Sequence, residues 1–396
     1  MRNLLTRNLL LTTVCSALLL GTGPAAVNAQ SAFYTATPAD VAGGSPGSLI
    51  RIEKDPFSSD GATKYTVLYR SVGLDGEPIA VSGMVFVPNA PMPAGGWPIV
   101  AWGHPTSGLQ PKCGPSVARW GTEQVQGLSA LIQQGYVVTA TDYPGLGTPG
   151  PHPFLVGESE GRAVLDSIRA ARQLIGDASP YAALWGHSQG GQAVLFAATL
   201  AESYAPDVKL AGVAAAAPAT ELAALLDDDI GTPGGKNLLA MTLYSWNLVY
   251  DAPIADVVTP TAMKTVDGLA DVCLESIVDV LPRMMSGNAL MKDFLSVDDV
   301  TELSPWKELI TANTVGTLPP TLPVLLVQGS EDDTVPPSVT ADYLTKLCAA
   351  GSTVTMVTLP RVGHLTTAKE GAPAFVEWVT TVGHGGSVAN DCPPAN

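Results

Sequence analysis

The stretch YAALWGHSQGG, residues 181–191, decides the fold. Its first half is an apolar run that predicts a buried strand, and the residues after it show a helical pattern as far as Tyr204. Gly186 and Gly190 frame Ser188 in a G-x-S-x-G pattern, which is typical of a strand that turns sharply into a helix. Because a Cβ at either glycine would collide with neighbouring backbone in so tight a turn, the pattern predicts that the Ser188 hydroxyl projects from the edge of a sheet.

Apolar and β-branched runs recur on both sides of this stretch. Two runs that alternate in polarity, residues 65–72 and 79–88, predict an antiparallel hairpin at a sheet edge. Six continuous apolar runs predict parallel strands buried on both faces: residues 97–103, 136–145, 181–188, 210–219, 323–332 and 354–364. Helical patterns lie between them, at residues 123–134, 158–175, 191–204, 338–350 and 374–382. We therefore expect an α/β fold with about eight strands, mostly parallel, and helices as crossovers.

Residues 221–316 interrupt this alternation of strands and helices. No clear strand pattern occurs there, whereas Ala, Leu, Met and Val recur at helical spacing. We expect a helical insertion that forms a cap over the carboxyl edge of the sheet. The core of the fold is then divided between residues 30–220 and 317–396.

The first 29 residues have the pattern of a secretory signal peptide. Arg2 and Arg7 come before an apolar run at residues 9–21, and small residues precede Ala29. The apolar run is too short for a membrane-spanning helix, which needs roughly 20 residues. We expect export with cleavage after Ala29, and no later segment is predicted to cross a membrane.

The composition narrows the class of protein and of partner. Hydrophobic residues make up 46% of the 396 residues and charged residues 14%, so burial of apolar surface can offset the entropy cost of ordering the chain. The formal net charge is -16, which argues against a nucleic-acid partner because phosphate binding needs Lys and Arg. Small or neutral partners are expected instead.

The cysteines point to disulfides. Cys15 lies in the predicted leader, which leaves Cys113, Cys273, Cys348 and Cys392. An even number of cysteines in an exported chain predicts two disulfides, and the sequence allows three pairings. Their spacing contains no C-x-x-C, so no metal site is expected.

A serine hydroxyl needs a base to remove its proton and an acid to orient that base. After a G-x-S-x-G serine these partners follow in the order acid, then histidine. His364 follows the last predicted strand, and it alone among the five histidines lies at the right distance beyond a loop rich in acids; His384 is near the glycine-rich terminus. That loop contains Glu331, Asp332 and Asp333; Glu331 is the least favoured, and the residues themselves leave the choice between the two aspartates open.

The oxygen of a carbonyl attacked by Ser188 would gain negative charge, so hydrogen-bond donors should already point at it. The backbone N–H of Gln189 is the first expected donor. The second should come from the loop after residues 97–103, where Pro105 has no N–H to offer. His104 is the first choice there and Thr106 the second.

Three further stretches resemble the secretory lipase family: LAESYAP at residues 200–206, CGPS at 113–116 and HLT at 364–366. The likeness extends from about Trp97 to the end of the chain. It implies the α/β-hydrolase fold and a carboxylic ester hydrolase. The expected partners are small-molecule or lipid esters, with a lipid–water interface as a further candidate. None of these motifs implies a metal or an organic cofactor.

The resemblance also assigns individual residues. The acid of the family lies four residues before a proline in a D-x-x-V-P-like stretch, which implies Asp332 before Pro336. The second donor in the best-known family member is an acidic residue shortly after a tryptophan, and here the residue two positions after Trp102 is His104. A carboxyl contribution is therefore absent at this position, although the backbone N–H is retained.

The family's disulfide pattern and cap are implied in the same way. The cysteine beside the loop after residues 97–103 pairs with one in the cap, which implies Cys113 with Cys273 and leaves Cys348 with Cys392. The family's helical cap falls at residues 221–316 and covers a channel for an acyl chain.

The sequence thus indicates a secreted serine ester hydrolase, a lipase or carboxylesterase, that works through Ser188, Asp332 and His364. An acyltransferase or amide hydrolase with the same three residues is the alternative, because the leaving group and the acceptor depend on the pocket. A catalytically silent binding protein is a further alternative. The acyl chain length and the oligomeric state are left open.

Overall fold

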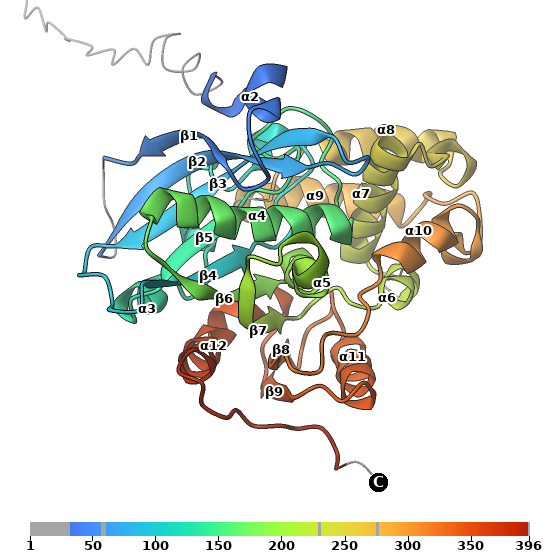
Figure 1. Ribbon diagram of the computed structural model, residues 1–396. Helices are drawn as coiled ribbons and strands as arrows, with labels where there is room; N and C mark the ends of the chain where they lie inside the picture. Colours follow the sequence, from blue (N-terminus) through green and yellow to red (C-terminus); the bar gives the residue numbers. More distant parts are fainter. Residues whose placement is uncertain (1–31, 57–60, 229–230, 275–276, 395–396) are drawn as a thin grey trace, which may run out of the picture.

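A single nine-stranded sheet with helices on both faces forms the centre of the molecule (Figure 1). The computed structural model describes residues 32–56, 61–228, 231–274 and 277–394. The predicted leader, residues 1–29, lies outside the described residues. The strands follow one another in the order β1-β2-β3-β5-β4-β6-β7-β8-β9.

The sheet is parallel except at one edge. Its strands are β1 (Leu49–Lys54), β2 (Ala62–Val72), β3 (Pro78–Pro88), β4 (Trp97–Gly103), β5 (Val137–Thr141), β6 (Ala178–His187), β7 (Lys209–Ala216), β8 (Val324–Gly329) and β9 (Val354–Leu359). The pairs β1–β2, β2–β3 and β3–β5 are antiparallel, and all remaining pairs are parallel. The eight predicted strands are all present, and the expectation of a mostly parallel sheet is confirmed.

The ninth strand corrects the expected count. β1 pairs with β2 through Leu49 and residues 51–54, so the predicted hairpin of β2 and β3 is not the edge of the sheet. The sequence of β1 is LIRIEK, in which three of the six residues are charged and the last three are exposed. An exposed edge strand needs no apolar run, and for this reason the sequence pattern did not reveal it.

Alternate residues of the central strands enter two different apolar layers. In β4, Ile99 and Ala101 pack with α4 (Gly157–Ile175) and α5 (Gln189–Tyr204), whereas Val100 and Trp102 pack on the opposite face. That opposite face is covered by α3 (Leu128–Gln133) and α12 (Thr367–Gly383). α11 (Pro337–Ala349) joins the first layer, and the short α2 (Pro38–Ala42) precedes the sheet.

Two helices differ from their predicted bounds by more than two residues. α12 begins at Thr367 and continues through Pro373, whereas the prediction placed its start after that proline. Its buried face, which includes Phe375 and Trp378, packs on the sheet, and this packing outweighs the cost of a proline inside a helix. α3 begins later than predicted because Gly127 before it has a positive φ of 83°, which interrupts the helix.

Between β7 and β8 the described residues contain five α-helices. They are α6 (Leu222–Asp228), α7 (Pro233–Tyr250), α8 (Pro260–Ala270), α9 (Ile277–Leu290) and α10 (Trp306–Asn313). They gather at one end of the sheet (right in Figure 1) around an apolar cluster of their own, which also contains Ala217 and Ala219 from the segment just after β7.

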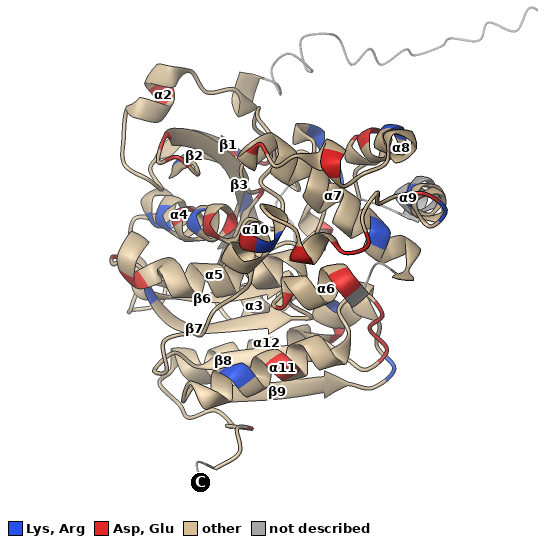
Figure 2. Ribbon diagram, turned by 90° about the vertical axis from the view of Figure 1, so that its right-hand side faces the viewer, with Lys and Arg blue, Asp and Glu red and all other residues tan. Residues whose placement is uncertain are grey.

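Figure 2 shows acidic and basic residues interspersed on α8 and α10. Among the described residues, no helix is long and apolar enough to cross a membrane.

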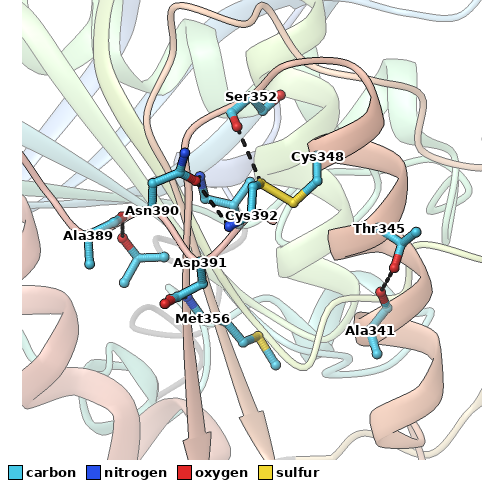
Figure 3. Close-up of a disulfide and its surroundings, with 11 residues drawn as sticks. Ala341, Thr345, Cys348, Ser352, Met356, Ala389, Asn390, Asp391 and Cys392 are labelled. Carbon is cyan, nitrogen blue, oxygen red and sulfur yellow. Dashed lines mark hydrogen bonds between the residues drawn. A yellow bond between two sulfur atoms is a disulfide. The ribbon is translucent and has the colours of Figure 1, made fainter. Parts of the chain in front are cut away.

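Two disulfides link distant parts of the chain. Cys113 is bonded to Cys273, which lies between α8 and α9, and Cys348 of α11 is bonded to Cys392 of the C-terminal tail. These are the pairings that the family resemblance implies. Figure 3 shows the second bond, beside which the tail runs along β9: the N–H of Asp391 donates to the carbonyl of Val354 at 2.7 Å.

Removing the Cys348–Cys392 bond is expected to destabilise the fold. The bond closes a segment with a sequence separation of 44, and the double variant C348S/C392S should lower the free energy of unfolding by about 2–4 kcal/mol because the unfolded chain regains entropy. Urea denaturation of the parent and the variant measures this difference. An unchanged unfolding midpoint would show that the hydrogen bonds between the tail and β9 hold the tail without the disulfide.

Candidate active site

Ser188 stands at the turn between β6 and α5. Its backbone has φ 57° and ψ −119°, a left-handed conformation that is costly for a residue with a side chain. A Cβ at Gly186 would lie 2.1 Å from the carbonyl oxygen of Gly190, and a Cβ at Gly190 would lie 2.0 Å from that of Gly103. The predicted tight turn is therefore present, and both glycines are required by close backbone contacts.

The structure brings together the three residues that the sequence selected. Nε2 of His364 lies 2.9 Å from Oγ of Ser188, and Nδ1 of His364 lies 2.8 Å from Oδ2 of Asp332. The three side chains follow β6, β8 and β9, whose carboxyl ends meet at one edge of the sheet. All three are buried. The arrangement can pass a proton from the serine to an oriented imidazole.

Asp332 rather than Asp333 faces the histidine. Its Oδ1 accepts hydrogen bonds from the N–H groups of Thr334 at 3.0 Å and Val335 at 2.8 Å, whereas Asp333 is exposed. Burial raises the pKa of the Asp332 carboxyl, but the hydrogen bond and charge of His364 and the two N–H donors outweigh burial and bring the pKa below its usual value. The carboxyl is therefore an anion that can orient His364.

His187 is a contributor that sequence reasoning passed over. Its Nε2 lies 3.0 Å from the backbone carbonyl oxygen of His364, and the two rings are 4.9 Å apart between centroids. Burial lowers the pKa of His187 to about 3, so its ring is neutral. A neutral ring in this place supports the backbone of His364 without adding a competing charge. Its position inside the G-x-S-x-G motif was the available signal.

The two candidates for the second donor lie in different surroundings. His104 is buried, with Nδ1 2.7 Å from the carbonyl oxygen of Pro105 and Nε2 3.2 Å from that of Asp142. Burial lowers its pKa to about 4. Thr106, the second choice from the sequence, lines the cavity at Ser188 together with Gln189, and His104 does not. Of the two candidates, Thr106 is therefore the one that lines the cavity.

The cavity at Ser188 has an apolar wall and little free space. Its volume is about 30 Å³, which is room for about one water molecule. The wall is formed by leucines of α6 and α7, by Phe154 and Leu155 of the loop before α4, and by Ala219 and Val335. The leucines are Leu222, Leu225, Leu226 and Leu238. Such a wall suits the hydrocarbon part of a substrate.

A larger groove of about 1090 Å³ lies along α3 and α12. Its lining includes Ser129, Lys369 and Glu377 but no histidine, so it holds no serine–histidine pair. In the part of the chain that the structure describes, no group of three or more His, Cys, Asp or Glu residues is placed to hold a metal ion. The cavity at Ser188 is therefore the candidate active site.

Residues 121–389 match the family described as secretory lipase. The chain belongs to the secretory lipase family. It is thus a lipase-like carboxylic ester hydrolase, and the predicted family and enzyme class are confirmed.

Similar sequences include Lipase A of Arthroderma benhamiae, which is 26% identical over 381 residues that cover 88% of this chain and 78% of that protein. A Mycobacterium tuberculosis protein named a probable inactive lipase is 26% identical over 369 residues, or 85% of this chain and 78% of that protein. Candida antarctica lipase A in its closed state superposes with a TM-score of 0.76 at 22% identity, over 91% of this chain and 87% of that chain. The α/β-hydrolase fold is confirmed by this likeness.

The turn at Ser188 leads to a prediction about stability. Gly190→Ala should lower the free energy of unfolding by about 3 kcal/mol or more, because its Cβ would overlap the backbone of Gly103. Gly268→Ala is the matched control: this glycine lies within α8, nothing is within 4 Å of its added Cβ, and alanine favours a helix by about 1 kcal/mol. Thermal unfolding of both variants provides the measurement, and equal melting temperatures would contradict the assigned contact.

Proposed function

We propose that this secretory lipase is an exported enzyme that hydrolyses acyl esters through an acyl-serine intermediate on Ser188. The observation that carries the proposal is the chain of two hydrogen bonds from Ser188 through His364 to Asp332. As Oγ bonds to the ester carbonyl carbon, Nε2 of His364 takes its proton and then gives it to the departing alcohol oxygen. Water next attacks the carbonyl carbon of the acyl-serine while His364 takes a proton from it. His364 then gives this proton to Oγ of Ser188 as the acyl C–O bond breaks, and the carboxylic acid leaves.

Asp332 sets the form of the histidine that this mechanism requires. A carboxylate anion can only accept a hydrogen bond, so Nδ1 of His364 carries the proton and donates it to Oδ2 of Asp332. Nε2 is then unprotonated and can accept the Ser188 hydroxyl proton. The same negative charge stabilises the imidazolium that forms when the proton moves.

The backbone N–H groups of Gln189 and Thr106 are our proposed donors to the developing oxyanion. Gln189 is the first residue of α5, where the helix dipole favours negative charge. Among the described residues, neither N–H group donates a hydrogen bond within the protein. Both residues line the cavity beside Ser188, and Thr106 replaces His104, our first choice from the sequence.

We infer that an apolar acyl group binds beneath the helices at residues 221–316, which act as a cap. A cavity of about 30 Å³ cannot hold an acyl chain, so α6 with Leu222, Leu225 and Leu226 must move for the substrate to enter. Lipid or other acyl esters are the substrate class that fits such a wall. The leader pattern of residues 1–29 and the two disulfides support export to an oxidising compartment.

A catalytically silent binding protein is the competing interpretation, because one relative is named a probable inactive lipase. That interpretation needs a broken catalytic set, whereas Ser188, His364 and Asp332 are all present and in contact here. A fluorophosphonate reacts with a serine only when the serine is activated. Covalent labelling of Ser188 therefore separates the enzyme from the binding protein.

Ser188→Ala is expected to abolish turnover. Removing the nucleophile should reduce kcat for p-nitrophenyl esters by about a millionfold and leave the fold intact, because alanine fits wherever serine does. Initial rates over a series of acyl lengths, together with circular dichroism spectra, provide the measurement. A purified Ser188→Ala protein that retained the parental rate would refute the acyl-serine mechanism.

The two adjacent aspartates offer a matched pair of variants. Asp332→Asn should lower kcat by about 10⁴-fold, because the amide favours the wrong tautomer of His364. Asp333→Asn changes an exposed neighbour of the same type and should keep the parental kcat. Steady-state kinetics of both variants test the assignment, and the reverse order of effects would identify Asp333 as the acid.

A further inference from the structure

The residue after the nucleophile has a buried side-chain network of its own. Nε2 of Gln189 lies 2.7 Å from Oε1 of Glu160 and 3.0 Å from Nε2 of His152. Gln189, Glu160 and His152 are all buried. Neither Glu160 nor His152 lines the cavity at Ser188, so the network stands behind the site and not in it.

The protons of this network can be assigned from its acceptors. Nδ1 of His152 lies 2.9 Å from the carbonyl oxygen of Pro144, which can only accept, so Nδ1 carries the hydrogen. Burial lowers the pKa of His152 to about 3, and the neutral ring then presents Nε2 as an acceptor. The two N–H groups of the Gln189 amide are thus both used, one toward His152 and one toward Glu160.

Glu160 holds two parts of the site with a single oxygen. Its Oε1 accepts from the Gln189 amide and, at 3.0 Å, from the backbone N–H of Leu155, which lines the cavity. Burial raises the pKa of Glu160 well above its usual value, which favours the protonated form of the carboxyl. Oε2 of Glu160 and Oε1 of Gln189 are both buried and without a hydrogen-bond partner among the described residues.

The peptide between Ser188 and Gln189 is the element that this network can fix. Its carbonyl oxygen, on Ser188, accepts from the N–H groups of Gln192 at 3.1 Å and Ala219 at 3.3 Å. Its N–H belongs to Gln189, whose side chain is held from the opposite end by Glu160 and His152. A strained backbone such as that of Ser188 persists only where its surroundings hold it on several sides.

We infer that Glu160, together with His152, is a positioning residue that keeps the N–H of Gln189 aimed at the oxyanion. The same carboxyl oxygen fixes Leu155, so it also sets the distance between the oxyanion donor and the apolar wall. This inference rests on the proposed function, since it concerns the donor that the acyl-serine mechanism requires. Glu160 acts through Gln189 and has no contact with the cavity.

The test uses Glu160→Met, which removes the acceptor and keeps a chain of similar length. We expect kcat to fall about tenfold to a hundredfold with little change in KM, because a misaimed donor loses part of the stabilisation that an oxyanion donor gives. The affinity for a trifluoromethyl ketone should fall by the same factor, since its adduct with Ser188 carries the same oxyanion. Glu160→Gln keeps an oxygen acceptor and adds an N–H donor. Its kcat and its affinity for the trifluoromethyl ketone should therefore stay at the parental values.

Asp166→Asn is the control for a purely structural effect. Asp166 lies on the same helix, is equally buried, and accepts hydrogen bonds from Ser71 at 2.7 Å and Tyr204 at 2.6 Å. It belongs to no part of the proposed machinery. Asp166→Asn should lower the melting temperature and leave the affinity for the trifluoromethyl ketone at the parental value.

A double-mutant cycle tests the route through the amide. Gln189→Met alone should reduce kcat as Glu160→Met does, and the pair should lose no more than one variant alone. Additive losses, or parental ketone affinity in Glu160→Met, would overturn the inference. If Glu160→Met does not fold, Gln189→Met takes its place and should show the same loss of ketone affinity. Parental ketone affinity in Gln189→Met would then contradict the inference.

Fluorophosphonate labelling of the parent separates this inference from the proposed function. Labelling at Ser188 together with parental ketone affinity in both methionine variants would remove the positioning role and leave the acyl-serine mechanism standing. A parent that is not labelled at all would overturn the proposed function and this inference with it.

Discussion

The close approach of three backbone segments at Gly103, Gly186 and Gly190 is the constraint on which the site depends. The end of β4 touches the start of α5 so tightly that a Cβ at Gly190 would overlap the carbonyl of Gly103. This contact forces the left-handed conformation of Ser188 and places the loop after β4, with Thr106, beside the first N–H of α5. Ser188 and the two proposed oxyanion donors are therefore held by the same packing.

The parallel strands β8 and β9 place Asp332 and His364 beside Ser188. Because β6, β8 and β9 run in one direction, the residues that follow them meet at one edge, and residues 176 positions apart come into hydrogen-bond contact. His364 and, to a smaller extent, the N–H groups of the loop after β8 outweigh burial and lower the pKa of Asp332. The fold thus sets both the place and the protonation state of the acid.

The parts of the structure that the sequence predicted are those with a local signature. Strands buried on both faces show as apolar runs, and the turn at Ser188 shows as paired glycines. β1 was missed because an exposed edge strand has no such run, and α12 was shortened because the packing of its apolar face overrides Pro373. The preference for His104 over Thr106 depended on which loop residue faces the cavity, and residue type does not encode that choice.

Glu160 shows why the network behind the site has no sequence signature. Acidic residues are common in the first turn of a helix because they interact favourably with the helix dipole. From the sequence, Glu160 therefore looks like an ordinary surface residue. Asp332 and Glu160 are both buried carboxyls, but their partners differ. Asp332 faces a histidine and two N–H groups, and its pKa is below the usual value despite burial. Glu160 accepts from an amide and one N–H, and burial raises its pKa well above the usual value. In its protonated form, Glu160 would add no charge that repels the proposed oxyanion. Asp332, by contrast, is separated from Ser188 by the imidazole of His364, where its charge would stabilise the protonated ring of the proposed mechanism.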